Sequence, residues 1–352
     1  MSKNNNLNRV LMVQQMIPHY RIPIFNRLSQ LVDLTVAADQ YDKDLSYEFK
    51  INKIDIFSIG PFVKIKNLSK LQISHFDALI ITFNIRYIDL FWLLFFRNKS
   101  TKLIVWGIGV SSEQGYDRKT KFDKIRYWIA KKADAVVFYS SNPIDKYVKK
   151  GGVPRSKLFV ANNTISLKSF LFKDKKKYFL FVGTLKKYKK INELILLFND
   201  AYLEYPEILD LHIVGDGDYM KSLIDQIGEL GLSKKIVLHG SITNEKQLAE
   251  IYRYAIASIS PFQAGLSVLQ SMSMGVPFMT LKDSITGGER FNIKDCENGF
   301  LVEDEVKFVS LLLDLSKNPE NFESLGENAF NYFNEHCSVE SMVSGFEKAL
   351  LQ

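Results

Sequence analysis

Four lysines follow a glycine at the end of an apolar run, and together they could bind a diphosphate. The run Tyr178–Val182 ends at Gly183, Thr184 comes next, and the basic residues are Lys186, Lys187, Lys189 and Lys190. A glycine lets the backbone approach a phosphate, and an ammonium group compensates its charge. Positive charge at a helix start opposes the helix dipole, which favours an anionic ligand here. The alternative is that these lysines only solvate the start of a helix.

Two further glycine-containing loops could also bind an anion such as a diphosphate. Gly215-Asp216-Gly217 stands where a strand turns into a helix, and Ala264-Gly265-Leu266-Ser267 opens another helix. A helix start offers unpaired amides to an anion, although tight strand–helix turns also use glycine routinely. Neither half carries Gly-x-Gly-x-x-Gly after its first strand, and Gly-x4-Gly-Lys-Ser/Thr is missing from the chain. The sequence therefore argues against a nicotinamide dehydrogenase and a P-loop nucleotidase.

The elements that must position these loops alternate between strand and helix. In the second half, short apolar runs predict strands at 178–182, 209–214, 236–239, 257–260 and 277–280. Apolar residues at helical spacing predict helices around 191–198, 223–230, 248–255 and 266–274. Repeated strand–helix units of this length predict a parallel sheet with helices on both faces. The second half is therefore predicted to be a doubly wound α/β domain.

The first half repeats this arrangement less regularly. We predict strands at 9–14, 32–37, 78–82, 102–106, 135–139 and 158–161, and helices at 22–31, 88–96, 119–132 and 143–149. The predicted organisation is an N-terminal Rossmann-like domain at 1–168, a basic linker at 169–177, a second Rossmann-like domain at 178–335 and a C-terminal helix at 336–352. Two such domains are expected to face each other across a cleft in which ligands bind.

Composition and charge narrow the class of protein. Of the 352 residues, 46% are hydrophobic and 24% are charged, which is typical of a soluble globular chain. Two cysteines are too few for a disulfide framework, and no apolar run approaches the roughly 20 residues of a membrane-spanning helix. We expect a cytoplasmic protein. Residues 1–170 carry 27 Lys and Arg against 13 Asp and Glu (+14), whereas residues 171–352 carry 19 against 26 (−7).

The basic first half suggests an anionic partner, either a membrane surface or a phosphate-bearing substrate; the alternative is a solvated lysine-rich surface. The predicted helix at 119–132 places Phe122, Ile125, Trp128 and Ile129 on one side, with Lys121, Lys124, Lys131 and Lys132 around them. A basic amphipathic helix with an aromatic residue can lie on an anionic membrane, although such a stripe is more often core. The apolar stretch 90–96 is most simply a buried crossover helix.

Ordered motifs across nearly the whole chain resemble the GT-B-fold glycosyltransferases, in particular the retaining family 4 type. In the second half these are Phe-Val-Gly-x-Leu-x3-Lys at 181–189, Ile-Val-Gly-Asp-Gly at 213–217, Val-x-Leu-x-Gly ending at Gly240, Leu-x-Ser-Met-x-x-Gly-x-Pro at 269–277, the Gly-Gly segment at Gly287 and Asn-Gly-Phe-Leu-Val at 298–302. In the first half they are Pro-x-Tyr-Arg-x-Pro-x-Phe at 18–25, Trp-Gly-x-Gly at 106–109, Ala-Asp-Ala at 133–135 and Val-x-Asn-Asn-Thr at 160–164.

The chain departs from the family pattern at several positions. The arginine usual after the first glycine of the second domain is Thr184, and the paired glutamates fall on Phe262 and Gln270. Gln270 could still hold the nucleotide ribose by hydrogen bonding, whereas Phe262 cannot accept a hydrogen bond from a sugar. The histidine frequent in the Trp-Gly-His-Gly segment is Ile108. These departures leave Lys189 as the most secure predicted diphosphate ligand.

The resemblance assigns roles to the remaining candidates. It implies a donor site formed by Gly183, Thr184, Lys189, Lys190, Gly215, Gly217, Gly240, Ser241, Ile242, Gly265, Leu266, Ser267 and Gln270. The nucleotide base is expected near Gly240-Ser241-Ile242, by analogy of position. Glu289 is the best carboxylate to face the cleft, and a solvated loop glutamate is the alternative. His19, Arg21 and Asn163 are expected on the acceptor side, where His19 could also be an ordinary loop histidine and Arg21 could pair with an acceptor phosphate or the donor diphosphate.

The sequence thus predicts a glycosyltransferase that moves a sugar from a nucleotide-diphosphate donor to a growing surface glycan of capsule, O-antigen or exopolysaccharide type. The resemblance implies retention of anomeric configuration, no metal and no other cofactor, with Lys189, Glu289 and His19 as the catalytic candidates. The acceptor is expected to be lipid-linked, with peripheral contact to the inner face of an anionic membrane and no nucleic-acid partner. The alternative is a catalytically silent module of the same fold that binds a glycan or a partner enzyme.

Overall fold

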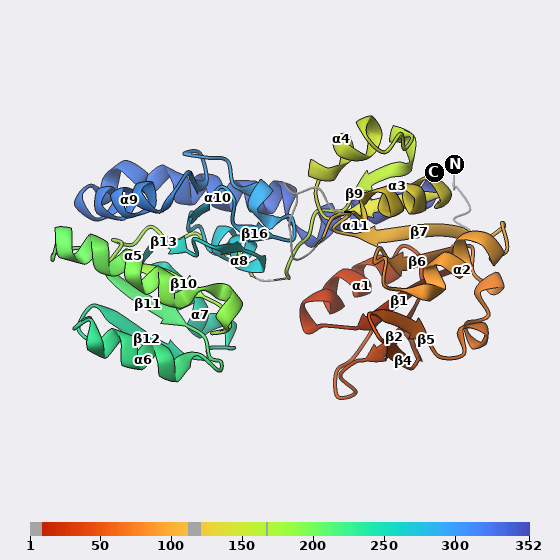
Figure 1. The fold of residues 1–352 in the computed structure, drawn as a ribbon, viewed down its shortest axis with the longest axis horizontal. Coiled ribbons are helices and arrows are strands. Elements are labelled where there is room, and N and C mark those ends of the chain that lie inside the picture. Colours follow the sequence, from red (N-terminus) through yellow and green to blue (C-terminus); the bar gives the residue numbers. More distant parts are fainter. Residues whose placement is uncertain (1–8, 112–120, 167) are drawn as a thin grey trace. The chain divides into compact units, whose positions relative to one another are not determined.

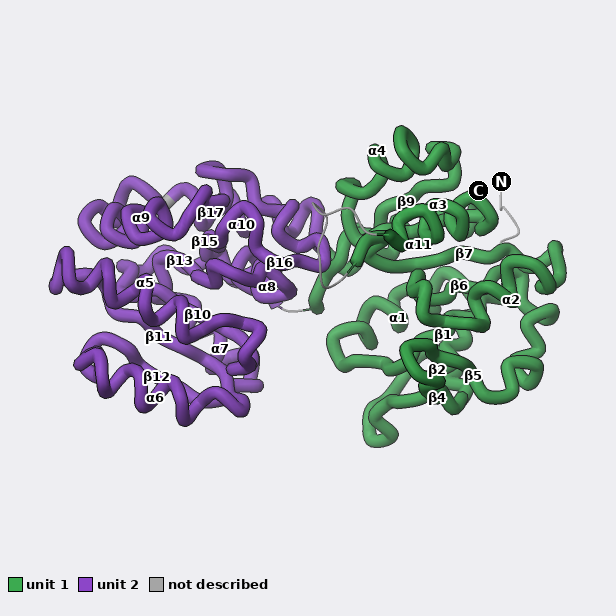
Figure 2. Tube along the Cα trace, in the orientation of Figure 1, with its two compact units in different colours: residues 1–166, 338–352 green, residues 167–337 purple. Residues whose placement is uncertain are grey.

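The computed structural model describes residues 9–111, 121–166 and 168–352. It divides into two compact units, one formed by residues 1–166 and 338–352 (unit 1) and one by residues 167–337 (unit 2) (Figure 2). Each unit is built on its own parallel sheet, so the predicted pair of Rossmann-like α/β domains is confirmed (Figure 1). No helix among the described residues is both long and apolar enough to cross a bilayer.

Unit 1 contains a seven-stranded sheet of order β3-β2-β1-β6-β7-β8-β9, in which every neighbouring pair is parallel. Its strands are β1 (Arg9–Met16), β2 (Asp33–Gln40), β3 (Lys50–Lys53), β6 (Ala78–Thr82), β7 (Lys102–Gly107), β8 (Ala135–Phe138) and β9 (Leu158–Val160). An antiparallel hairpin, β4 (Ile56–Ile59) and β5 (Phe62–Ile65), accompanies it. The sequence did not predict β3, β4 or β5, because none of them contains a continuous apolar run such as the one that marks the equally short β8.

Helices cover both faces of this sheet. They are α1 (Ile22–Ser29), α2 (Ile88–Phe96), α3 (Asp123–Lys132), α4 (Asn142–Lys149) and α11 (Val339–Leu351). Alternate residues of β1 serve opposite cores: Val10 and Met12 pack with α1 and α11, whereas Leu11 and Val13 pack with α2, α3 and α4. Period-two alternation between two apolar faces is what a doubly covered parallel strand requires. Residues 119 and 120, the start of the predicted 119–132 helix, lie outside the described residues.

The C-terminal helix α11 belongs to unit 1, although the whole of unit 2 precedes it in the sequence. Ser338 caps it by accepting a hydrogen bond from the Ser341 amide at 3.2 Å. Gly345 lies so close to β9 that a Cβ there would stand 2.2 Å from the Val160 carbonyl oxygen. The sequence marked this helix as a separate segment, whereas the structure makes it one layer of the first domain.

Unit 2 contains a six-stranded parallel sheet of order β12-β11-β10-β13-β15-β17. Its strands are β10 (Tyr178–Val182), β11 (Asp210–Val214), β12 (Ile236–Gly240), β13 (Ala255–Ile259), β15 (Phe278–Leu281) and β17 (Gly299–Val302). A separate parallel pair joins β14 (Gln263–Ala264) to β16 (Ile285–Thr286). The five predicted strands match β10, β11, β12, β13 and β15.

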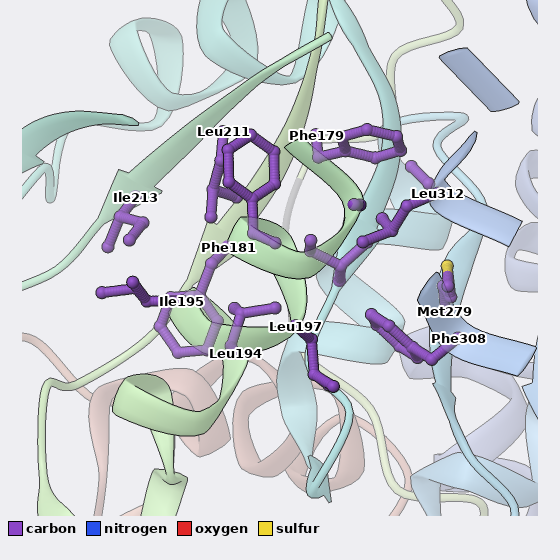
Figure 3. Packing of buried hydrophobic residues seen from close by; sticks show 14 of the residues in the cluster. Phe179, Phe181, Leu194, Ile195, Leu197, Leu211, Ile213, Met279, Phe308 and Leu312 are labelled. Atoms are coloured by element: carbon purple, nitrogen blue, oxygen red, sulfur yellow. The ribbon is translucent and has the colours of Figure 1, made fainter. Parts of the chain in front are cut away.

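The helices of unit 2 are α5 (Ile191–Glu204), α6 (Met220–Glu229), α7 (Glu245–Arg253), α8 (Leu266–Ser273), α9 (Glu305–Lys317) and α10 (Glu323–His336). Figure 3 shows Phe179 and Phe181 of β10 in one cluster with Leu194 and Ile195 of α5 and with Phe308 of α9. Each such buried side chain contributes about 1.5–3 kcal/mol. The predicted basic linker is attached to this unit, since the Phe170 amide donates to the Ser273 carbonyl at 2.9 Å.

Candidate functional site

Three loops of unit 2 lie side by side where β10, β11 and β12 end. The Gly183 amide donates to the Val214 carbonyl at 3.0 Å, and the Gly215 amide donates to the Gly240 carbonyl at 2.8 Å. The Leu185 amide donates to the Asp216 carbonyl at 2.9 Å. These backbone hydrogen bonds bring the predicted glycines of the three loops to one edge of the sheet, which is where doubly wound folds bind ligands.

Two of these positions accept only glycine. A Cβ on Gly215 would stand 1.8 Å from the Gly183 carbonyl oxygen, and one on Gly217 would stand 2.4 Å from the Leu185 carbonyl oxygen. Both contacts are with backbone, which cannot move aside as a flexible side chain would. Gly215 and Gly217 are therefore required for the close approach of the β10 and β11 loops, whatever ligand the loops bind.

The lysine segment forms a short 3-10 turn, η5 (Lys187–Lys189), that leads directly into α5. Lys187 and Lys190 are exposed, whereas Lys189 is partly buried. Burial lowers the pKa of Lys189, because desolvation disfavours the ammonium form, and the negative charge of Glu289 opposes this shift. A partly desolvated ammonium gains more from an anionic ligand than an exposed one does, which supports Lys189 as the main cation of the site.

Glu289 is held in place by its own loop rather than solvated. The residue is only 4% exposed, so the alternative of a solvated loop glutamate is wrong. Its carboxylate accepts hydrogen bonds from the Gly287 amide at 3.0 Å and the Thr286 hydroxyl at 3.3 Å. Thr286 in turn accepts hydrogen bonds from the Gly288 and Arg290 amides, each at 3.1 Å. Sequence reasoning missed this role of Thr286, although the run Thr-Gly-Gly-Glu contains it.

Phe262 stands where the resemblance to the glycosyltransferases places a glutamate, and it contacts a lysine of the predicted site. The Lys190 ammonium lies 4.8 Å from the centre of the Phe262 ring, within the range of a cation–π interaction. Lys190 itself has φ +53°, a left-handed conformation that ends the 3-10 turn and starts α5. Thr184, on the first loop, is exposed. The sequence indicated the loss of a carboxylate at Phe262, but the contact with Lys190 appears only in the structure.

The start of α8 is the remaining segment of unit 2 that is predicted to bind the donor. Its N-cap is Gly265, and its first turn carries no acidic side chain. Gly265, Leu266, Ser267 and Gln270 are all partly exposed, so this helix end can meet an anion without charge repulsion. Across the sheet edge, Ser241 is exposed and Ile242 packs against the cluster that contains Leu248 and Tyr252.

In unit 1 the structure brings Arg21 and Asn163 together. The guanidinium group donates to the Asn163 side-chain oxygen at 2.7 Å and to the Met342 sulfur at 3.3 Å, and it lies 4.8 Å from the Trp106 ring centre. Arg21 is only 6% exposed. His19, by contrast, is exposed and contacts the edge of the Tyr20 ring. These contacts hold the Arg21 side chain in a fixed position, whereas the exposed His19 side chain is accessible to solvent or to a ligand.

Two buried donors on the same sheet face escaped the sequence reasoning. Among the described residues, Gln14 Nε2 and Trp106 Nε1 are buried and have no hydrogen-bond partner. Gln14 and Trp106 occupy alternate positions of β1 and β7 that face the core containing Met12 and Ile104. A signal existed, since Trp106 belongs to the Trp-Gly-x-Gly motif. Within the described ranges, no group of three or more His, Cys, Asp and Glu side chains could hold a metal ion.

Comparisons with known proteins bear on both units. Residues 162–332 match the family model described as Glycosyl transferases group 1. No curated protein sequence matches the chain significantly.

Several solved structures share the fold over nearly the whole chain. The apo form of the lipopolysaccharide outer core galactosyltransferase WaaB is 19% identical, with a TM-score of 0.69, covering 97% of this chain and 99% of that chain. A variant of TarM from S. aureus, in complex with fondaparinux, alpha-GlcNAc-glycerol and UDP, is 13% identical, with a TM-score of 0.70 and coverage of 98% and 100%. HepE from Anabaena, in complex with UDP-glucose, is 15% identical, with a TM-score of 0.70 and coverage of 98% and 99%.

At these identities the likeness to solved structures establishes the fold, and the family model establishes the class. The parallel sheet of unit 2, its glycine loops and its lysine segment lie within the matched residues. The chain is therefore a glycosyltransferase with the GT-B fold, in which residues 162–332 match the glycosyl transferases group 1 model.

Proposed function

We propose that this enzyme transfers a sugar from a nucleotide-diphosphate donor to a growing surface glycan, with retention of anomeric configuration and without a metal. The observation that carries the proposal is the desolvated ammonium of Lys189 beside the edge where three glycine loops are joined by backbone hydrogen bonds. An anionic ligand at this edge would meet loop amides, the lysines and the start of α8. This is the electrostatic arrangement that a departing diphosphate requires.

In the proposed reaction the bond between the sugar anomeric carbon and the diphosphate oxygen breaks, and a bond to an acceptor hydroxyl oxygen forms. The acceptor proton passes to the leaving phosphate oxygen, so no protein nucleophile is needed. Lys189, with Lys190 in place of the missing arginine, stabilises the negative charge that develops on the diphosphate. The negative charge of Glu289 favours the ammonium form of Lys189 and so opposes the lowering of its pKa by burial.

The structural neighbours indicate which donors and which class of acceptor should be tested first. The TarM and HepE structures contain UDP or UDP-glucose, which makes uridine donors the first to test. WaaB acts on the lipopolysaccharide outer core according to its description, which fits a surface glycan as the acceptor class.

A catalytically silent glycan- or partner-binding module remains the second candidate. The observation that favours it is Phe262, whose ring contacts Lys190 at the position where the family glutamate would contact the transferred sugar. A silent module would bind the acceptor glycan and show no turnover with any donor.

Calorimetric titration with UDP, GDP, CDP and dTDP tests the proposal, followed by sugar transfer from the matching donor to a glycan acceptor. We expect one nucleotide to bind clearly more tightly than the others and transfer to occur without added metal and in the presence of a chelator. If none of the four nucleotides binds, the donor site is not functional and the silent module replaces the proposal.

A further inference from the structure

The helix α2 exposes an apolar stripe where a water-facing helix would carry polar residues. Leu90, Leu93 and Leu94 are buried, as the sequence interpretation of a crossover helix requires. On the other side, Trp92 is 50% exposed, Phe95 56% and Phe96 68%. The expectation of a buried crossover helix at 90–96 is therefore correct for one face of the helix and wrong for the other. Three large exposed side chains within two turns form a patch rather than scattered apolar residues.

The apolar area continues onto α3. The Trp128 ring stacks on the Phe91 ring, with 6.1 Å between the ring centres, and its centre lies 5.6 Å from that of the Phe95 ring. The two helices therefore pack against each other through aromatic rings. Beside this contact, Phe122 is 53% exposed and Ile125 is 38% exposed. Of the stripe predicted for this helix, Ile129 is core and Trp128 joins α2, while Phe122 and Ile125 face solvent. The exposed side chains of both helices therefore belong to one continuous region.

A hairpin and a hollow extend the region further. A cavity of about 480 Å³ is lined on one side by Trp92 and Phe96 and on the other by Lys64 and Leu68. Lys64 lies opposite Phe57 in the β4–β5 hairpin, and Ile59 lies opposite Phe62, so these four side chains share one face. Phe57, Ile59 and Phe62 are each more than 40% exposed. We call the exposed part of α2, α3 and this hairpin face the α2–α3 surface.

The exposed charge of the two helices has a single sign. The acidic residue of α2, Asp89, is 4% exposed, and its carboxylate accepts a hydrogen bond from the Ile65 amide at 2.6 Å. The acidic residue of α3, Asp123, is 8% exposed and pairs with Arg126 and Lys146. Lys124 and Lys132, four residues before and after Trp128, are exposed. Unit 1 as a whole contains 27 Lys and Arg against 15 Asp and Glu, a net charge of +12.

We propose that the α2–α3 surface docks on an anionic lipid bilayer, an inference that rests on the proposed transfer of a sugar to a surface glycan. Tryptophan and phenylalanine insert at the boundary between headgroups and acyl chains, and lysines beside them bind anionic headgroups. A second copy of this chain would bring two strongly positive units together, which disfavours self-association through the same surface. The combination of aromatic and basic residues, with no exposed acid on α2 or α3, matches a negatively charged membrane.

Vesicle co-sedimentation of the full chain tests this proposal. The vesicles contain phosphatidylglycerol mixed with phosphatidylcholine, and phosphatidylcholine alone is the reference. We expect binding to the anionic vesicles, and a loss of about tenfold or more in the partition coefficient for Trp92→Gln/Phe96→Gln. Lys124→Gln/Lys132→Gln should lose about fivefold for each lysine and should flatten the dependence on salt.

The matched control is Leu203→Gln/Val306→Gln, which removes two apolar side chains that are 71% and 79% exposed on unit 2. It should bind vesicles as the unchanged chain does. Equal losses in the control and in the α2 variant would overturn the assignment of the surface. Absence of vesicle binding by the unchanged chain would also overturn it, and a concentration-dependent dimer abolished by Trp92→Gln/Phe96→Gln would assign the surface to self-association.

Nucleotide binding separates this inference from the proposed function. Trp92 and Phe96 lie in unit 1, so their replacement should leave the dissociation constant of the donor nucleotide unchanged. Nucleotide binding and transfer to a soluble acceptor without vesicle binding would refute only the docking surface. Vesicle binding without nucleotide binding would refute only the proposed transfer.

Discussion

Among single residues, we expect Lys189 and the charges around it to determine how tightly the donor binds. Burial lowers the pKa of this lysine and Glu289 opposes the shift, so the ammonium is partly desolvated and lies near only one identified carboxylate. A diphosphate would add the negative charge that this environment lacks. Lys187, in the same turn, is exposed and gains less from an anion.

We therefore expect Lys189→Ala to raise the dissociation constant of the nucleotide diphosphate about tenfold or more, the effect of losing a charge-assisted hydrogen bond. Calorimetric titration measures it. Lys187→Ala is the matched control and should change the dissociation constant much less. An unchanged constant for Lys189→Ala would remove Lys189 from the donor site.

Phe262 is predicted to hold the Lys190 ammonium toward the donor. Phe262→Leu keeps an apolar side chain but removes the cation–π contact, so nucleotide affinity should fall about two- to fivefold, equivalent to 0.5–1 kcal/mol. The same substitution in a Lys190→Met background should have no further effect, because the cation is already gone. Additive losses in the double variant would show that the two residues act independently.

At the scale of elements, the close contact between α11 and β9 sets the cost of a side chain at Gly345. Alanine normally favours a helix over glycine by about 1 kcal/mol, but here its Cβ would overlap the Val160 carbonyl oxygen. We expect Gly345→Ala to destabilise unit 1 by about 1–3 kcal/mol in denaturant unfolding. Gly228→Ala in α6, where no heavy atom lies within 4 Å of the added Cβ, should stabilise unit 2 instead.

Two neighbouring strands of unit 2 carry a histidine pair whose protonation is linked to stability. His212 of β11 lies 3.1 Å from His239 of β12, ring nitrogen to ring nitrogen, and stacks on Tyr178. Burial, with a smaller effect of His239, lowers the pKa of His212 to about 4. Burial lowers the pKa of His239 as well. The folded state therefore favours neutral imidazoles in both residues.

Because the unfolded chain binds these protons more readily, the free energy of unfolding of unit 2 should fall as the pH decreases from about 6.5 toward 4. His212→Gln should flatten this dependence, measured by denaturant unfolding at several pH values. His75→Gln, which removes an exposed histidine of unit 1, is the control and should leave the slope for unit 2 unchanged. A slope that survives His212→Gln would contradict the assignment.

At the scale of the whole molecule, the chain completes its first unit with its last helix. Met342, Val343 and Phe346 of α11 lie in the same core as Val10 and Met12 of β1, so unit 1 cannot complete this face until the whole chain is present. The two units also differ in net charge. Unit 1 carries +12 and the whole chain +7, so unit 2 carries −5.

Truncation after Cys337 should therefore unfold unit 1 while leaving unit 2 folded. Removing α11 exposes the apolar face formed by β1, β7 and β8. The large buried side chains of α11 contribute about 6–12 kcal/mol there, which is comparable to the whole stability of a typical domain, about 5–15 kcal/mol. Calorimetric unfolding should show the loss of one transition, and nucleotide binding by unit 2 should persist. Two intact transitions in the truncated chain would show that α11 is dispensable.

The fold class, the position of most strands and helices, and the glycine and lysine segments of the predicted donor site could all be predicted from the amino-acid sequence. These depend on local signals: apolar periodicity, glycine at strand ends and clustered charge. The bounds of β6 (Ala78–Thr82) and α2 (Ile88–Phe96) were predicted to the residue, because each contains a continuous apolar run, at 78–81 and at 90–96. The short strands β3 to β5 lacked such a run.

Only the tertiary structure decided the contacts between distant residues. Hydropathy cannot show which side of α2 faces solvent, because every position except Asp89 is apolar, so Trp92 and Phe96 were assigned to a buried helix. The Phe262–Lys190 contact joins positions that share no local pattern. The packing of α11 in unit 1 depends on the fit of Gly345 against β9. The sequence of a helix does not show which distant strand the helix will pack against.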